Sequence, residues 1–203
     1  MAAMIGCPLA AGASACPGAP ALVGADGSVH SYRQLHEVCI RLANRLPDWP
    51  AGTRVALVEP DRARLVRRIV ACWYRGWVAV PLDHRMSEQA MAEVCAQLRL
   101  RRWPRLSDGT GGSGAGRRKR VETGPTLQTC WRADQCATMT LTSGSTGAPK
   151  AVLHTFGNHA ASAAGLRAAL NLSSDTRWLL SLPLFHIGGL ALLWRVWSAG
   201  AHW

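Results

Sequence analysis

Short apolar runs that suit strands alternate with helical patterns in the first half of the chain, and this alternation limits the fold more than any other feature. Helical spacing of apolar residues follows Ser31, Asp61 and Ser87, whose side chains can each accept a hydrogen bond at a helix N-terminus. Arg54–Val58 and Trp77–Leu82 lie between these helices and read as short buried strands. Strands that alternate with helices predict an α/β fold with a largely parallel sheet flanked by helices.

The second half of the chain continues this pattern after an interruption. Residues 106–125 contain a glycine-rich run and a basic run and are predicted to form a flexible surface loop. Residues 1–30 are rich in Ala, Gly and Pro and are expected to be poorly ordered. The elements predicted after the loop are strands at Cys136–Thr142, Ala151–His154 and Trp178–Leu182, a helix from about Asn158 to Leu170, and a helix over Gly188–Ala199.

The net charge of +11 is concentrated in Arg99–Arg105 and Arg117–Arg120. Such a balance permits nucleic acid, anionic membranes or phosphorylated ligands as partners, although a run of charge is most often a solvated face. Apart from Trp103, the two runs lack interleaved aromatic residues and match no nucleic-acid motif, so no nucleic acid is expected. The seven cysteines form no CxxC pair, which favours reduced thiols in the cytoplasm. No apolar run reaches the roughly 18 residues of a spanning helix, so no stable membrane insertion is expected.

The segment Leu141–Lys150 (LTSGSTGAPK) follows a predicted strand and has the features of a phosphate-binding loop. Gly144 and Gly147 permit the positive φ angles of a backbone anion nest. Lys150 adds a mobile positive charge. Hydroxyl donors are supplied by Thr142, Ser143, Ser145 and Thr146. The alternative is a plain linker, but the glycine-rich run at Asp108–Gly116 has neither a preceding strand nor a lysine at a fixed offset.

The sequence TSGSTGAPK matches the signature loop of the adenylate-forming (AMP-binding, acyl-CoA synthetase-like) superfamily. A second motif of that superfamily follows at Pro183–Leu190 (PLFHIGGL). Over Ala137–Ala201 the sequence resembles the o-succinylbenzoate–CoA ligases of menaquinone biosynthesis, and the resemblance is looser but colinear from Ser31 to Leu98. It implies that residues 31–203 are the N-terminal part of the adenylate-forming enzyme fold.

The resemblance also implies a chemistry. A carboxylic acid, expected to be o-succinylbenzoate, attacks the α-phosphate of Mg²⁺-bound ATP, and CoA then displaces AMP to form a thioester. Lys150 and His186 would be catalytic, and Thr146 would contact the metal. The loop residues expected to hold the nucleotide are Thr142, Ser143, Gly144, Ser145, Thr146, Gly147 and Lys150. The acid would be bound by His186, Gly188, Gly189 and Arg195, with the glycines leaving room for an aromatic ring.

Arg195 lies in an otherwise apolar helical segment, LLWRVW. A buried guanidinium needs a partner, and o-succinylbenzoate has two carboxylates, of which one is activated. Arg195 is therefore predicted to recognise substrate charge, directly or through water. Two alternatives are a side chain that reaches the surface and a pair with an internal Asp or Glu.

Members of this superfamily are more than twice as long, and their ribose-binding acid, Mg²⁺-associated glutamate and C-terminal lid domain with its lysine have no match here. The resemblance thus predicts a truncated partial domain that is inactive alone, while a full-length protein is compatible with a homo-oligomer. The alternatives are a ligase for another aryl or fatty acid and a non-catalytic ATP-binding fragment.

Overall fold

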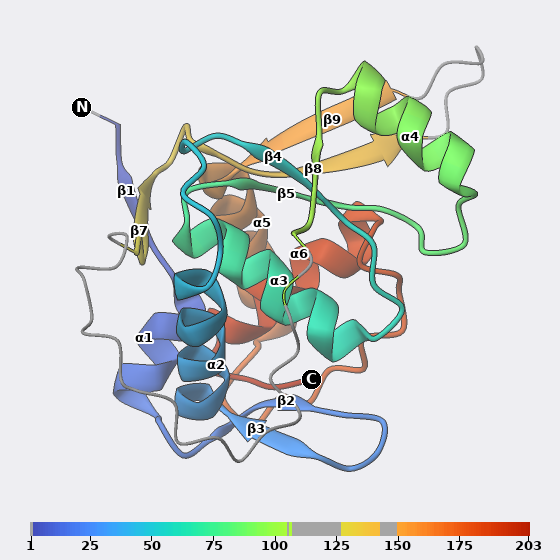
Figure 1. Ribbon diagram of the computed structural model, residues 1–203. Helices are drawn as coiled ribbons and strands as arrows, with labels where there is room; N and C mark the ends of the chain where they lie inside the picture. The colour runs from blue at the N-terminus through green and yellow to red at the C-terminus, as the bar shows by residue number, and fades with distance from the viewer. Residues whose placement is uncertain (1, 105, 107–126, 143–149) are drawn as a thin grey trace, which may run out of the picture.

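The computed structural model describes residues 2–104, 106, 127–142 and 150–203, which Figure 1 shows as a ribbon. The strands are β1 (Met4–Gly6), β2 (Pro20–Val23), β3 (Val29–Ser31), β4 (Arg54–Leu57), β5 (Val78–Pro81), β6 (Arg101–Arg102), β7 (Cys130–Arg132), β8 (Cys136–Thr142) and β9 (Lys150–Thr155). The helices are α1 (Pro8–Ala15), α2 (Tyr32–Asn44), α3 (Arg62–Tyr74), α4 (Glu88–Gln97), α5 (Phe156–Leu170) and α6 (Ile187–Trp197).

The central sheet has five strands in the order β6-β4-β5-β8-β9. The pairs β4–β6, β4–β5 and β5–β8 are parallel, and β8–β9 is antiparallel. Two small antiparallel sheets, β1–β7 and β2–β3, complete the described strands. In Figure 1 α2, α3, α5 and α6 lie on one side of the central sheet and α4 on the other. The predicted fold class, with its largely parallel sheet flanked by helices, is confirmed.

The pleat of the sheet divides the apolar residues between two cores. In β5 the side chain of Ala79 joins the large core with the helices below, whereas Val78 and Val80 join a smaller core. Met91 and Val94 of α4 pack into that smaller core. Because successive strand residues face opposite sides, an uninterrupted apolar run is what a sheet covered on both faces requires.

The three predicted helix starts are confirmed. The backbone N–H of Gln34 donates to the Ser31 hydroxyl at 3.3 Å, and the Gln34 side chain completes a capping box with the Ser31 backbone. Asp61 accepts from the backbone of Arg64 at 2.9 Å in the same way. Ser87 caps α4 through the backbone N–H of Ala90 at 3.1 Å. Each cap satisfies an N–H that the helix itself leaves without a partner.

Aromatic side chains form the centre of the large core. The rings of Trp131 and Phe156 stack with centroids 4.1 Å apart, and Trp73 and Trp194 lie beside Phe156. The indole of Trp73 donates to the carbonyl of Ala137 at 3.1 Å, so a buried N–H is satisfied. These contacts join α3, β7, α5 and α6 beneath the sheet.

Residues 2–30 differ from the expectation of poor order, because they form β1, α1 and β2. Leu9 and Leu22 are fully buried in the large core. A Cβ added at Gly12 would collide with the ring of Tyr32, so a residue without a side chain lets α1 approach α2 closely. Small residues permit tight packing here as well as disorder, and composition alone does not separate the two.

The strand predicted at Trp178–Leu182 is wrong. These residues form no strand, and the adjoining Arg177 makes only an isolated bridge with His202. Leu179 is 81% exposed, and the carbonyls of Leu180 and Ser181 accept hydrogen bonds from Arg62 on α3. A short apolar run can form a β-strand of a sheet, but it can equally form an extended segment whose backbone is hydrogen-bonded by side chains.

Of the loop predicted over residues 106–125, Leu106 is described and the rest lies outside the described residues. Within the described ranges, no helix combines the length and the apolar character needed to cross a bilayer.

Candidate active site

The predicted phosphate loop connects two paired strands. Thr142 at the end of β8 and Lys150 at the start of β9 are partners in the antiparallel ladder. The Thr142 hydroxyl also donates to the Lys150 carbonyl at 3.3 Å, and both residues are exposed. The loop is therefore held at its two ends by a hairpin that belongs to the central sheet. The expectations for Ser143, Gly144, Ser145, Thr146 and Gly147, including the metal contact of Thr146, lie outside the described residues.

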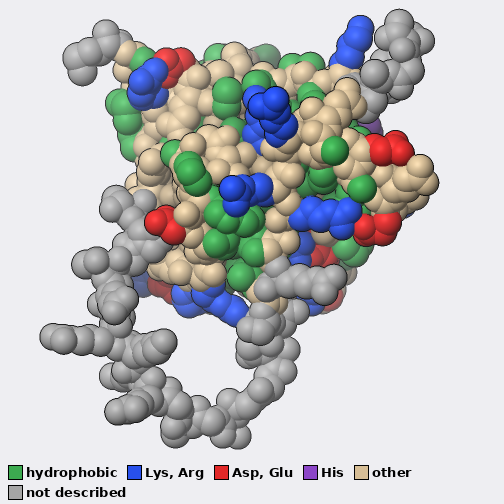
Figure 2. Space-filling model, turned by 45° about the horizontal axis from the view of Figure 1, so that its top comes forward, with side chains coloured by type: hydrophobic (Ala, Val, Ile, Leu, Met, Phe, Trp, Pro, Cys, Tyr) green, Lys and Arg blue, Asp and Glu red, His purple; other side chains and the backbone are tan. Residues whose placement is uncertain are grey.

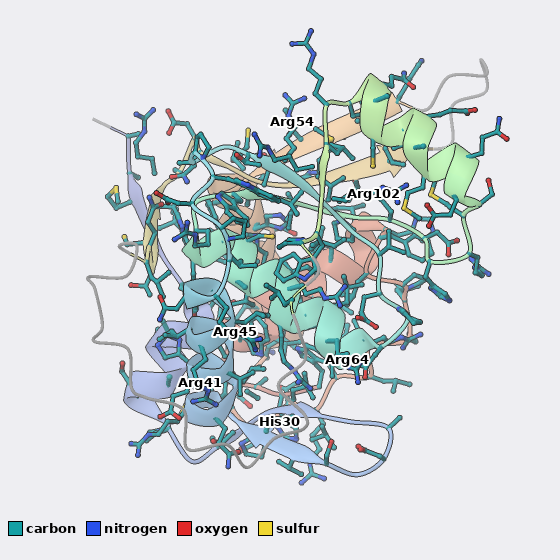
Figure 3. The ribbon with its side chains drawn as sticks, viewed as in Figure 1. His30, Arg41, Arg45, Arg54, Arg64 and Arg102 are labelled. Atoms are coloured by element: carbon teal, nitrogen blue, oxygen red, sulfur yellow. The ribbon has the colours of Figure 1, made fainter. Side chains whose placement is uncertain are left out.

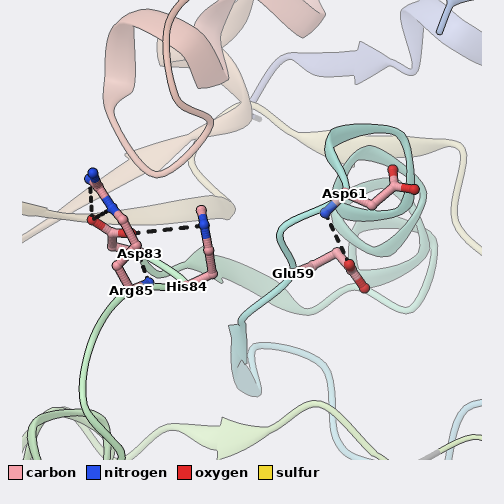
Figure 4. Close-up of polar contacts among 5 residues, drawn as sticks. All are labelled: Glu59, Asp61, Asp83, His84 and Arg85. Carbon is pink, nitrogen blue, oxygen red and sulfur yellow. Dashed lines mark hydrogen bonds and ion pairs between the residues drawn. The ribbon is translucent and has the colours of Figure 1, made fainter. Parts of the chain in front are cut away.

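Thr142 and Lys150 lie at the edge where the parallel strands have their carboxyl ends, which is where open α/β sheets bind ligands. Glu59 follows β4 and Asp83 follows β5 at this same edge. Asp83 pairs with Arg85 at 2.7 Å and lies 3.9 Å from a ring nitrogen of His84, as Figure 4 shows. Hydrogen bonding from Arg85 lowers the pKa of Asp83 to about 2, so this carboxylate is ionised at neutral pH.

Glu59 is buried and forms an ion pair with Arg68 at 2.7 Å. It also accepts from the backbone N–H of Asp61 at 3.1 Å (Figure 4), which ties it to the start of α3. Sequence reasoning missed Glu59 and Asp83, although an acid two residues after each of two neighbouring parallel strands is a readable signal. Among the described residues, no group of three or more His, Cys, Asp or Glu is placed to hold a metal ion.

The second predicted motif forms the start of α6. His186 is the residue before the helix, and its backbone N–H donates to the carbonyl of Pro183 at 3.1 Å. Its ring is exposed and lies beside Phe185, with centroids 4.6 Å apart. An exposed imidazole at a helix N-terminus, where backbone N–H groups are free, is suited to an anionic ligand.

Gly188 and Gly189, predicted to leave room for the acid, have different surroundings. A Cβ at Gly189 would collide with the backbone carbonyl of Pro183 and lie 2.7 Å from that of Leu182. A Cβ at Gly188 would lie 3.0 Å from a Leu182 methyl group. The missing side chain of Gly189 thus lets the first turn of α6 pack directly on backbone.

Arg195 is half-buried on α6 and reaches the neighbouring helix α5. Its Nη2 and Nε donate to the hydroxyl of Ser162 at 2.9 and 3.3 Å. No carboxylate in the described part of the chain forms an ion pair with it, so the alternative of an internal Asp or Glu finds no support there. The guanidinium is oriented by a neutral hydroxyl, and its charge is left for another partner.

His154 of β9 and His159 of α5 each make a hydrogen bond with a threonine of β8. His159 Nε2 is 2.9 Å from the Thr138 hydroxyl, and His154 Nε2 is 3.0 Å from the Thr140 hydroxyl. The pKa of His159 is lowered to about 4, mainly by burial and to a smaller extent by the nearby His154 and Arg195. His159 is therefore a neutral, hydrogen-bonded core residue.

We expect this buried histidine to make stability depend on pH. The ordinary pKa of 6.5 applies to the unfolded chain, and the folded value is about 4, so between these values the unfolded chain binds the extra proton. Stability is fully present above pH 6.5 and falls by about 3 kcal/mol as the pH drops toward 4. Urea unfolding across this range measures it. His159→Gln should remove this part of the slope, and an unchanged slope would contradict the assignment.

Comparison with known proteins gives two kinds of match. The family model of AMP-binding enzymes matches residues 9–103 and 104–203. The 2-succinylbenzoate–CoA ligase of Bacillus velezensis is 31% identical over 182 residues, which cover 81% of this chain and 36% of that protein. The corresponding ligase of Salmonella typhimurium is 32% identical over 150 residues, which cover 74% of this chain and 33% of that protein. The chain spans about a third of the length of these relatives.

The structural match concerns the fold. The solved structure of o-succinylbenzoate coenzyme A synthetase (MenE) from Bacillus subtilis, in complex with ATP and magnesium ion, superimposes with a TM-score of 0.81. The sequence identity is 24%, and the match covers 98% of this chain and 44% of that chain. The described elements thus have the arrangement of the N-terminal part of that structure.

Proposed function

Because the chain belongs to the AMP-binding enzyme family, we propose that the protein that carries it activates a carboxylic acid with ATP and transfers the acyl group to CoA. The proposed acid is o-succinylbenzoate, which supports a place in menaquinone biosynthesis. The names of the relatives support this acid, since both are 2-succinylbenzoate–CoA ligases. The observation that carries the proposal is the hairpin that presents exposed Thr142 and Lys150 at the ligand edge of the sheet.

In the proposed first step, a carboxylate oxygen attacks the α-phosphorus of ATP, and the bond to the bridging oxygen of pyrophosphate breaks. Negative charge then accumulates on the leaving pyrophosphate. Lys150 and the hydroxyls of Thr142, Ser143, Ser145 and Thr146 are proposed to hold the β- and γ-phosphates as this charge develops. Bound Mg²⁺, with Thr146 as its proposed protein contact, would neutralise phosphate charge.

In the proposed second step, the sulfur of CoA attacks the acyl carbon of the adenylate, and AMP leaves with the electron pair of the broken bond. His186 is proposed to lie beside the acid and the α-phosphate during both steps. Its exposed ring at the N-terminus of α6 supports this, because that helix end favours the negative charge of both groups.

Arg195 is proposed to recognise the carboxylate of the acid that is not activated. The contact with Ser162 supports this role, because it fixes the direction of the guanidinium while leaving the charge without an anionic partner among the described residues. Gly188 and Gly189 stay proposed contacts for the aromatic ring of the acid. Gly189 also lets the first turn of α6 pack on the backbone before it.

We expect Arg195→Lys to raise the KM for o-succinylbenzoate about 10- to 100-fold with a smaller change in kcat, because a lysine cannot make the two-point contact of a guanidinium. Ser162→Ala, which keeps Arg195 but frees its side chain, should raise the KM about threefold to tenfold. Steady-state kinetics with the acid varied measures both. Equal KM values in the wild type and Arg195→Lys would contradict the role.

The function itself is tested by o-succinylbenzoate-dependent exchange of labelled pyrophosphate into ATP, with benzoate and a fatty acid as comparison substrates. Exchange with o-succinylbenzoate alone supports the proposal, and preference for another acid indicates a different ligase of the family. ATP binding without exchange for any acid indicates a non-catalytic nucleotide-binding protein. The proposed location is the cytoplasm, and the seven free cysteines are consistent with a reducing compartment.

A further inference from the structure

Three threonines of β8 present their hydroxyls on the same face of the central sheet. Thr138, Thr140 and Thr142 alternate along the strand and face α5, whereas Met139 and Leu141 belong to the smaller core on the other side. Thr138 is fully buried and Thr140 is 3% exposed. Valine fills a similar volume and suits a buried strand equally well, so packing alone does not account for two buried hydroxyls.

Each of the two buried hydroxyls has a histidine as its partner. His159 of α5 binds Thr138, and His154 of β9 binds Thr140 through its Nε2 atom at 3.0 Å. Burial lowers the pKa of both imidazoles, so both rings are neutral at neutral pH. The first bond joins β8 to a helix, and the second joins β8 to β9, the two strands of the hairpin.

The bond between Thr140 and His154 lies near the end of the hairpin. Two further backbone pairs follow Thr140 in the ladder, and the second of them joins Thr142 to Lys150. In the described sheet β9 is an edge strand that pairs only with β8. The end of an edge strand has few backbone contacts and opens more readily than the interior of a sheet. A side-chain bond across the two strands therefore restrains the backbone that carries Lys150.

The arginines on the far side of the sheet cannot replace Lys150. Arg54 and Arg102, labelled in Figure 3, belong to β4 and β6, and β5 and β8 lie between these strands and β9. Because neighbouring strands are about 4.8 Å apart, β4 lies about 14 Å from β9 across the sheet. Basic side chains are spread among apolar ones on the face that Figure 2 shows. A displacement of Lys150 would thus weaken its own phosphate contact without compensation from these arginines.

We propose that Thr140 and His154 are positioning residues of the phosphate site. Their hydrogen bond fixes the end of the hairpin, so that Lys150 is directed at the bound nucleotide, and neither residue touches that nucleotide. The inference rests on the proposed function of the Leu141–Lys150 segment. It gives a purpose to a polar pair that packing does not require.

The bond between Thr138 and His159 has a different assignment. It lies farther from the loop and joins β8 to α5, so it contributes to stability and not to the position of Lys150. The chain therefore contains two pairs of the same chemistry on one face of one strand, of which only one is assigned to the phosphate site.

The test compares a valine substitution in each pair. Thr140→Val should weaken the binding of Mg²⁺–ATP about fivefold to tenfold, measured by calorimetric titration of the protein that carries this chain. Thr138→Val is the matched control, because Thr138 is also buried and also has a histidine partner. Its affinity for Mg²⁺–ATP should stay within about twofold of the wild type. Urea unfolding of both variants measures the loss of stability separately from the loss of affinity.

Substitutions that retain the hydrogen bond should retain the affinity. Thr140→Ser keeps the hydroxyl, and His154→Gln places an amide group near the position of Nε2, so both should bind Mg²⁺–ATP like the wild type. His154→Leu should lose as much affinity as Thr140→Val. In pyrophosphate exchange, Thr140→Val should raise the KM for ATP and leave the KM for the acid unchanged.

Equal affinities in the wild type and Thr140→Val, or equal losses in Thr140→Val and Thr138→Val, would overturn the inference. A wild-type protein that binds ATP but shows no exchange with any acid would contradict the proposed function alone, because the affinity is measured without an acid. Absence of ATP binding in the wild type would overturn both. If Thr140→Val does not fold, His154→Leu against His154→Gln gives the same comparison at a half-buried side chain.

Discussion

Gly189→Ala is expected to lower the free energy of unfolding by about 3 kcal/mol, which is a large part of the stability of an ordinary domain. The new methyl group would collide with the backbone carbonyl of Pro183 and lie 2.7 Å from that of Leu182. Neither carbonyl is the end of a flexible side chain, so the first turn of α6 or the segment before it must move. Such a shift would also displace His186, the residue that begins this helix.

The chain offers a matched control for this substitution. Gly165 is a helical glycine of α5, and a Cβ added there meets no heavy atom within 4 Å. Gly165→Ala should therefore stabilise the fold by about 0.5–1 kcal/mol through helix propensity alone. Urea unfolding monitored by circular dichroism measures both variants. If Gly189→Ala were as stable as Gly165→Ala, the close packing of α6 on Pro183 would be wrong.

Lys150→Met is expected to reduce o-succinylbenzoate-dependent pyrophosphate exchange about 100- to 1000-fold in the protein that carries this chain. Lys150 is exposed at the start of β9, and its ammonium group is proposed to stabilise the charge that grows on the leaving pyrophosphate. Methionine retains most of the length of the side chain but removes the charge. Because the backbone of Lys150 makes the ladder contact with Thr142, the hairpin should keep its register in the variant.

Lys150→Arg is the conservative comparison for this prediction, because it restores the charge with a different donor geometry. We expect the pyrophosphate exchange rate of Lys150→Arg to lie between that of the wild type and that of Lys150→Met. The affinity for ATP, measured separately, should fall less than the rate, since a group that acts mainly on developing charge affects kcat more than binding. Full activity in Lys150→Met would contradict the assigned role of the loop lysine.

The fold could be predicted from local patterns because caps and periodicity are local signals. Ser31, Asp61 and Ser87 begin helices as their side-chain chemistry dictates, and the apolar residues between them lie in the two cores. The exceptions have one cause. Leu9 and Leu22 are ordered by residues distant in the sequence, and Trp178–Leu182 is held by Arg62 of α3. Neither contact is encoded in the segment itself.

Some residues of the candidate site could likewise be predicted from the sequence, and others could not. Lys150, His186 and Arg195 could be singled out because they occur in recognisable motifs or in unfavourable surroundings. The partner of Arg195 could not, since a serine in an Ala-rich helix carries no signal until α5 and α6 are packed together. The position of Glu59 and Asp83 just after two strands is readable in the sequence, but their common position at one sheet edge depends on the strand order β4-β5-β8.

Residues in and beside the small β2–β3 sheet form hydrogen bonds with residues 197–203. The hydroxyl of Tyr32 donates to the carbonyl of Ala201, the indole of Trp197 donates to Ala21, and the backbone N–H of Val23 donates to Trp203 at 2.7 Å. Figure 1 shows the C-terminus beside β2. During synthesis on the ribosome, these contacts of residues 21–32 can therefore form only after residues 197–203 have emerged. Contacts of such long sequence separation slow folding, and a nascent chain arrested before Trp197 should leave β2 open to protease.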